Sequence, residues 1–104
     1  MVFIASPYWH ENKSIRDKRR KQVTEYAHRL AEKGIKNYCP LAYSEGFPEV
    51  GEGYWIEHGL EMIKICNMVI VYCLQGWEKS KGIKGEVKKA EKLGIPVCYA
   101  EGDE

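Results

Sequence analysis

The sequence predicts a single α/β domain over residues 1–104, with a small open parallel sheet and helices on both faces. Strand-like apolar runs alternate with amphipathic helical patterns in the order βαβαβαβ. The run Met68 to Leu74 is continuously apolar, which is typical of a central parallel strand covered on both faces. Helices between successive strands favour parallel pairing and right-handed connections. No repeat, linker or low-complexity tract interrupts the pattern.

The opening third of the chain indicates the first strand and the first helix. Val2 to Ala5 is a short apolar run closed by a Ser-Pro pair, as expected of a buried strand. Ser14 and Asp17 resemble a capping box that opens a helix. This helix continues to about Lys33 and ends at Gly34. Its apolar stripe consists of Val23, Tyr26, Ala27, Leu30 and Ala31.

The remaining elements follow from the same criteria. Ile35 to Cys39 forms a second, weaker strand, and residues 41–54, rich in glycine and aromatic residues, form a loop. Trp55 to Cys66 has apolar residues at helical spacing, which predicts a second helix. A third helix begins near Ser80 to Gly82, and Ile95 to Tyr99 forms the last strand.

This arrangement predicts where a ligand binds, because open parallel sheets bind ligands beyond the carboxyl ends of their strands. Four places meet that description: the Ser6-Pro7-Tyr8 turn, the loop after Pro40, the junction at 75–82 and the segment after Tyr99.

Composition and charge point away from several classes of protein. The net charge is +1 with 30% charged residues, so no strong field favours a nucleic-acid polymer or an anionic membrane. The apolar runs are too short to span a bilayer and the N-terminus lacks a signal-peptide pattern, so we expect a cytoplasmic protein. The four cysteines form no C-x-x-C pair and the histidines have no metal-binding spacing. We therefore expect free thiols, no metal site and no cofactor.

The stretch GWEKSKGIKGE, residues 76–86, joins the apolar strand to the third helix. Ser80, at or near the N-cap, adds a hydroxyl to free backbone N–H groups that favour an anion, and Gly82 allows close backbone approach. Glu86 lies one turn further on, at the border between core and solvent, where the positive helix end would keep it ionised. Such a carboxylate suits a nucleophile at a sugar carbon or an anion that stabilises an oxocarbenium-like centre. Alternatively, Ser80 is only a cap and Glu86 is one charge on a solvated helix.

A second candidate anion site lies on the first helix. Arg16 and Arg19 lie seven and four residues before Val23, which places both on the core-facing side near the strand ends. Arginine forks suit phosphate oxygens, so these two residues are the candidate phosphate ligands. Alternatively, the run RDKRRK is a solvated helix face.

Aromatic residues gather at the same predicted edge. Tyr8, Trp9 and Trp77 directly follow strands, where a flat ligand such as a nucleobase would stack. Others come from the loop and the second helix, and these are Tyr43, Phe47, Tyr54 and Trp55.

With these residues placed, the sequence resembles the nucleoside 2-deoxyribosyltransferase-like superfamily, and its small prokaryotic and phage branches in particular. Four features carry the resemblance. They are the opening V-F-I-A-S-P-Y, R-x-x-R at Arg16 and Arg19, L-x-x-x-x-x-C-N at 60–67, and G-W-E-x-S-x-G-x-x-x-E at 76–86, followed by A-x-x-L-G-I-P-V from Ala90. They cover nearly the whole chain in order; the last motif is fairly specific, and the others are weak alone.

The resemblance implies a flavodoxin-like, Rossmann-like fold, a homodimer, and cleavage of the N-glycosidic bond of a deoxynucleoside or its 5′-monophosphate. By that match Glu86 is the nucleophile that attacks C1′, and water or a second base then takes the sugar. Ser80 and Gly82 would hold sugar or phosphate, together with the turn formed by Ser6, Pro7 and Tyr8.

Three positions depart from the family pattern. Asn67 stands where the family has an Asp at the start of the central strand, Gly59 where it has a second Asp, and Phe3 where a Tyr orients the nucleophile. Glu57 and His58 are neighbouring groups that would support catalysis, although helical spacing turns each away from the direction of residue 59.

Three functions are therefore considered. The leading expectation is an N-glycosidase or deoxyribosyltransferase acting on a nucleoside or nucleotide through a glutamate nucleophile. The alternative is a non-catalytic nucleotide-binding or sensing module that keeps the pocket but lacks the supporting groups, and the third is a purely structural or interaction protein.

Overall fold

The structure is a computed structural model and describes residues 1–46 and 50–102. Four strands alternate with helices along the chain, which confirms the predicted α/β class. In chain order the elements are β1 (Val2–Ala5), α1 (Lys13–Glu32), β2 (Asn37–Tyr38), α2 (Pro40–Ser44), α3 (Glu52–Ile63), β3 (Met68–Cys73), the short 3₁₀ helix η1 (Trp77–Lys79), α4 (Lys81–Lys92) and β4 (Val97–Glu101).

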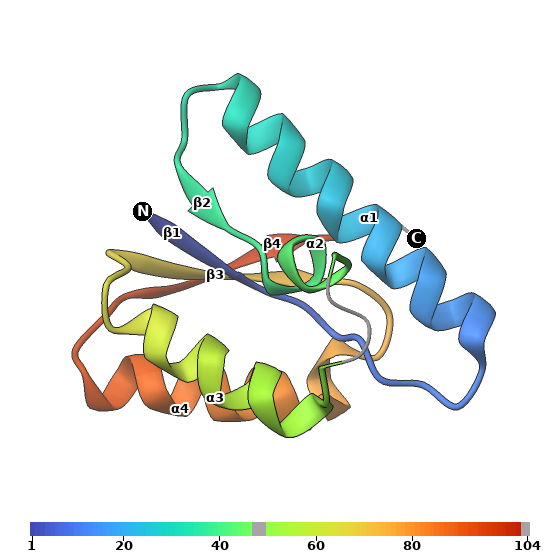
Figure 1. The fold of residues 1–104 in the computed structure, drawn as a ribbon. Coiled ribbons are helices and arrows are strands. Elements are labelled where there is room, and N and C mark those ends of the chain that lie inside the picture. The colour runs from blue at the N-terminus through green and yellow to red at the C-terminus, as the bar shows by residue number, and fades with distance from the viewer. Residues whose placement is uncertain (47–49, 103–104) are drawn as a thin grey trace.

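The strands form one parallel sheet in the order β2-β1-β3-β4. Helix α1 covers one face of the sheet, and α3 and α4 lie side by side on the other (Figure 1). The chain moves to one side of β1 on forming β2, and to the other side on forming β3 and β4. The carboxyl ends of β1 and β3 therefore flank the point where the direction of winding reverses, which is where open α/β sheets bind ligands.

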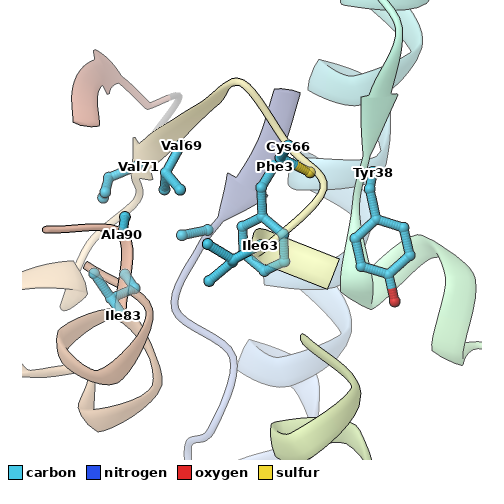
Figure 2. Close-up of a cluster of buried hydrophobic side chains, with 9 residues drawn as sticks. Phe3, Tyr38, Ile63, Cys66, Val69, Val71, Ile83 and Ala90 are labelled. Carbon is cyan, nitrogen blue, oxygen red and sulfur yellow. The ribbon is translucent and has the colours of Figure 1, made fainter. Parts of the chain in front are cut away.

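Side-chain alternation along the strands divides the core between the two faces. Phe3 and Ala5 of β1 point toward α3 and α4, whereas Ile4 points toward α1. The cluster under α3 and α4 is shown in Figure 2, where the Phe3 ring lies between Tyr38 and Ile63. Strand β3 has buried residues in both clusters, so its continuous apolar pattern arises, as predicted, because helices cover both of its faces.

The predicted capping box on α1 is wrong, because the helix begins earlier. Asn12 is the N-cap, and its Oδ1 accepts hydrogen bonds from the backbone N–H and the hydroxyl of Ser14 at 2.9 and 2.8 Å. Asp17 pairs instead with Lys13 at 2.8 Å. The predicted stop is confirmed, since Gly34 follows the helix with a φ of +81°.

Other predicted bounds shift for similar local reasons. The second strand pairs over two residues only, and Pro40 opens the short helix α2 in what was expected to be a loop. Helix α3 starts at Glu52 and ends at Ile63 rather than Cys66. The last strand is Val97–Glu101, later than predicted, because a turn at residues 93–94 and the two residues after it connect α4 to the strand.

The four cysteines are free thiols, as expected. Over the part of the chain that is described, no helix has the length and apolar character needed to cross a membrane.

Candidate functional site

The carboxyl group of Glu86 lies at the interface of α4, α3 and β1. A β-carbon placed on Gly59 of α3 would lie 3.6 Å from Oε2 of Glu86 and 3.7 Å from Cζ of Phe3. Glycine in a helix interior costs about 1 kcal/mol relative to alanine. Because Gly59 has no side chain, a small space remains there, and the Glu86 carboxyl and the Phe3 ring both lie beside it.

Burial raises the pKa of Glu86 to about 8, because the enclosed site disfavours the charged carboxylate. Among the described residues, none donates a hydrogen bond to this carboxyl or pairs with it. The expectation that the helix end keeps Glu86 ionised is therefore wrong. Glu86 lies beyond the first turn of α4, and the stabilising effect of a helix N-terminus is largely confined to that turn.

Two of the three departures thus border this site, since Gly59 lies against the Glu86 carboxyl and the Phe3 ring lies beside the same space. The third departure does not. Asn67 lies at the amino ends of the strands, where its side chain accepts a hydrogen bond from the N-terminal ammonium of Met1. It is therefore separated from the carboxyl edge of the sheet and from the rest of the candidate site.

A histidine–tyrosine pair lies next to this interface. Nδ1 of His58 is 2.8 Å from the hydroxyl of Tyr38, which stands at the carboxyl end of β2. Burial is the main reason that the pKa of Tyr38 is raised, with smaller contributions from neighbouring groups that include Glu86. Tyr38 therefore remains a neutral phenol. The adjacent Glu57 is exposed and has no place in this arrangement.

Aromatic rings surround His58. Four ring centroids lie between 5.5 and 5.7 Å from its imidazole, those of Tyr38, Tyr43, Tyr54 and Trp55. Tyr43 and Tyr54 are about half exposed, so part of this aromatic surface faces solvent. The predicted aromatic Phe47 lies outside the described residues.

The sequence pattern does not single out Tyr38, because this residue lies inside the predicted strand Ile35 to Cys39. The signal that would have found it is Pro40, which opens α2 and so ends β2 just before the loop. Tyr38 is then the last strand residue at the carboxyl edge, where binding residues are expected.

The start of α4 has the predicted local chemistry. Ser80 is the N-cap, and its hydroxyl accepts a hydrogen bond from the backbone N–H of Ile83 at 3.2 Å. Gly82 is exposed in the first turn.

Trp77 in η1 packs its ring 5.5 Å from that of Tyr99. It lines a small cleft of about 190 Å³ between α4 and β4, and neither Gly59 nor Glu86 lines that cleft.

The two candidate phosphate ligands of α1 bind backbone carbonyl groups in this structure. Arg19 donates to the carbonyls of Trp9 and Gln75 at 2.8 and 2.9 Å, so it ties the connection after β1 to the connection after β3. Arg16 donates to His10 at 2.5 Å, and its guanidinium lies 5.0 Å from the centroid of the Trp9 ring. Both residues hold the loops of the carboxyl edge in place.

The turn after β1 is mostly enclosed. Ser6 is half-buried, Pro7 is buried, and the ring of Tyr8 lies 4.9 Å from the guanidinium of Arg20. Arg20 also donates to the carbonyl of Leu41 at the start of α2. The structure therefore brings Ser6, Tyr8 and the arginines together at one edge of the sheet, while Glu86 and His58 lie on the face covered by α3 and α4.

No metal site is apparent, since no three His, Cys, Asp or Glu side chains of residues 1–46 and 50–102 come together.

Residues 12–99 match a family model described as "Domain of unknown function (DUF4406)". No curated protein sequence matches the chain significantly.

Proposed function

Because the chain belongs to the family described as a domain of unknown function (DUF4406), we propose its function from the site itself. We propose an N-glycosidase or deoxyribosyltransferase that cleaves the N-glycosidic bond of a (deoxy)nucleoside or its 5′-monophosphate. The observation that carries the proposal is the largely buried Glu86 carboxyl beside Gly59, which has no charged partner in the part of the chain that the structure describes. The sequence resemblance adds support, because it assigns the nucleophile to the same residue.

In the proposed reaction the ionised Glu86 attacks C1′ of the sugar and the base departs. The resulting glycosyl ester is then opened by water or by a second base. A carboxylate that has lost much of its hydration shell is a stronger nucleophile than one in water. Since the pKa of Glu86 is about 8, about a tenth of the molecules carry this carboxylate at pH 7. The fraction of molecules able to make the nucleophilic attack is therefore expected to rise with pH toward that value.

The start of α4 would hold the phosphate of a nucleotide substrate. Support comes from Ser80 at the N-cap and from Gly82, which exposes the backbone of the first turn. The side chains of Arg16 and Arg19 would act indirectly, by fixing the loops around this site.

The test is to incubate the protein with deoxynucleosides and their 5′-monophosphates and to measure free base by chromatography. Glu86→Gln keeps the size of the side chain but removes the nucleophile, so base release should fall at least about a thousandfold. Glu91→Gln, on the exposed part of the same helix, is the matched control and should leave release unchanged. Base release that survives Glu86→Gln would exclude Glu86 as the nucleophile.

A second candidate is a nucleotide-binding module without turnover. It is favoured by the absence of a hydrogen-bonding side chain at Phe3 and Gly59, which leaves Glu86 without the help that glycosidic cleavage needs. Nucleotide-dependent thermal stabilisation without base release would select this function. Ser80→Asp keeps an N-cap but repels phosphate, so it should abolish stabilisation by the monophosphate.

A further inference from the structure

A leaving base needs a proton as well as a nucleophile at C1′, and among the described residues His58 is a candidate donor on the helix that borders Glu86. Gly59, which borders the Glu86 carboxyl, directly follows His58 on α3. The His58 imidazole bonds to Tyr38, whose ring centroid lies 5.8 Å from that of Phe3. Phe3 in turn lies beside the same space at Gly59 as Glu86. The carboxyl and the imidazole are therefore linked through Phe3 and Tyr38 on the same face of the sheet.

We propose that His58, held in position by Tyr38, protonates the base as it leaves; this inference rests on the proposed function. His58 is half-buried and so can reach a bound ligand, whereas Tyr38 is 9% exposed and acts as the positioning residue. The partly exposed rings of Tyr43 and Tyr54 beside the imidazole would stack with a nucleobase.

The proton and electron balance of the step is complete. In the imidazolium form, Nδ1–H donates to the Tyr38 hydroxyl oxygen and Nε2–H donates to a nitrogen of the base. As the carboxylate of Glu86 forms its bond to C1′, the electrons of the C1′–N bond move to the base nitrogen, which takes the Nε2 proton. In the second half, neutral Nε2 accepts a proton from the water that attacks C1′, and the C1′–O bond to Glu86 breaks. Both residues return to their starting forms.

The titratable groups that act on Tyr38 of this pair come from three helices. They are Cys39 at the N-cap of α2, Tyr43 on α2, Tyr54 on α3 and Glu86 on α4. Glu86 is the acidic side chain among them, so a substrate bound between it and His58 would meet a carboxyl on one side and a proton donor on the other.

The test separates protonation from attack by changing the leaving group. Two substrates are compared: a deoxynucleoside 5′-monophosphate, whose base must be protonated, and 2-deoxyribose 5-phosphate bearing 4-nitrophenolate at C1′, which leaves without a proton. His58→Asn should slow base release at least about a hundredfold and change nitrophenolate release only a few-fold. Tyr38→Phe keeps the ring in the core and should cause a smaller loss with the same preference for the nucleotide. His28→Asn, on the exposed face of α1, is the matched control and should change neither.

Each other outcome contradicts the inference. Equal slowing of both substrates by His58→Asn would show a structural role, and no slowing of either would exclude His58 as the proton donor. A wild-type protein that releases nitrophenolate but no base would keep Glu86 as the nucleophile and overturn the assignment of His58. A wild-type protein that cleaves neither substrate would instead refute the proposed function itself.

Discussion

The buried carboxyl of Glu86 should make the folding stability of the protein depend on pH. Replacing Glu86 by Gln should remove most of that dependence. The pKa of this carboxyl is raised by burial from 4.5 in the unfolded chain to about 8 in the folded protein. Between these values the folded protein holds a proton that the unfolded chain releases. The stabilisation is therefore complete below pH 4.5 and is lost as the pH rises through 8.

The size of the loss follows from the pKa difference. Each pH unit within this interval lowers the free energy of unfolding by about 1.4 kcal/mol. Between pH 5 and pH 8 the full effect would be about 4 kcal/mol, and the solvent that reaches part of the Glu86 side chain reduces it to about 3 kcal/mol. In a domain of this size that loss lowers Tm by at least about 10 °C.

The assay is thermal denaturation of the wild-type protein and Glu86→Gln between pH 5 and pH 9, followed by circular dichroism. An amide needs no ionisation, so the variant should match the wild type at pH 5 and become the more stable protein above pH 7. Glu91→Gln controls for the loss of a carboxylate from the same helix and should follow the wild-type curve. Parallel curves for the wild type and Glu86→Gln would refute the reasoning, since Glu86 would then be hydrated or paired in the folded protein.

Three further predictions concern positions around this site. Gly59→Ala should raise the free energy of unfolding by about 0.5–1 kcal/mol in urea denaturation, because the new methyl group makes only ordinary contacts at 3.6 and 3.7 Å; a loss of stability would mean that the space is tighter than these distances. Phe3→Tyr adds a hydroxyl beside the ionised carboxylate, so the pKa of Glu86 should fall by about one unit, measured as a shift of the pH–stability curve; an unchanged curve would place the hydroxyl out of reach. Gly76→Ala should lower the free energy of unfolding by about 2 kcal/mol or more, because φ is +89° and the new β-carbon would lie 2.7 Å from the Arg19 guanidinium. Gly94→Ala, with a φ of +71° and open space around it, should lower it by only about 1 kcal/mol. Equal losses would show that the Arg19 side chain moves aside at no cost.

The fold was predictable because it depends on local periodicity. Alternating strand and helix patterns, the continuous apolar run of β3 and the glycines at helix ends give the order of elements directly. The bounds that were wrong depend on finer signals. Asn12 precedes Ser14 as a cap, and Pro40 opens a short helix as readily as it closes a strand.

The site was predictable only where its chemistry is local. The hydrogen bond from the Ile83 N–H to Ser80 follows from the N-cap position alone. The raised pKa of Glu86 depends on its burial, which arises only through packing of the sheet and α3 against α4 and which brings Gly59, distant in sequence, against the carboxyl. Of the three departures from the family pattern, Gly59 and Phe3 border the space beside the Glu86 carboxyl, whereas Asn67 lies at the other end of the strands.

The most direct test of the account is whether Glu86 becomes covalently linked to sugar. A 2-deoxy-2-fluoroarabinonucleoside 5′-monophosphate should let the ester form but slow its hydrolysis, because the fluorine destabilises the oxocarbenium-like transition state. Intact-protein mass spectrometry should then show one added fluorosugar phosphate, located on Glu86 by peptide fragmentation and absent from Glu86→Gln. Base release from an ordinary nucleotide with no adduct on Glu86, or an adduct on another residue, would contradict the account.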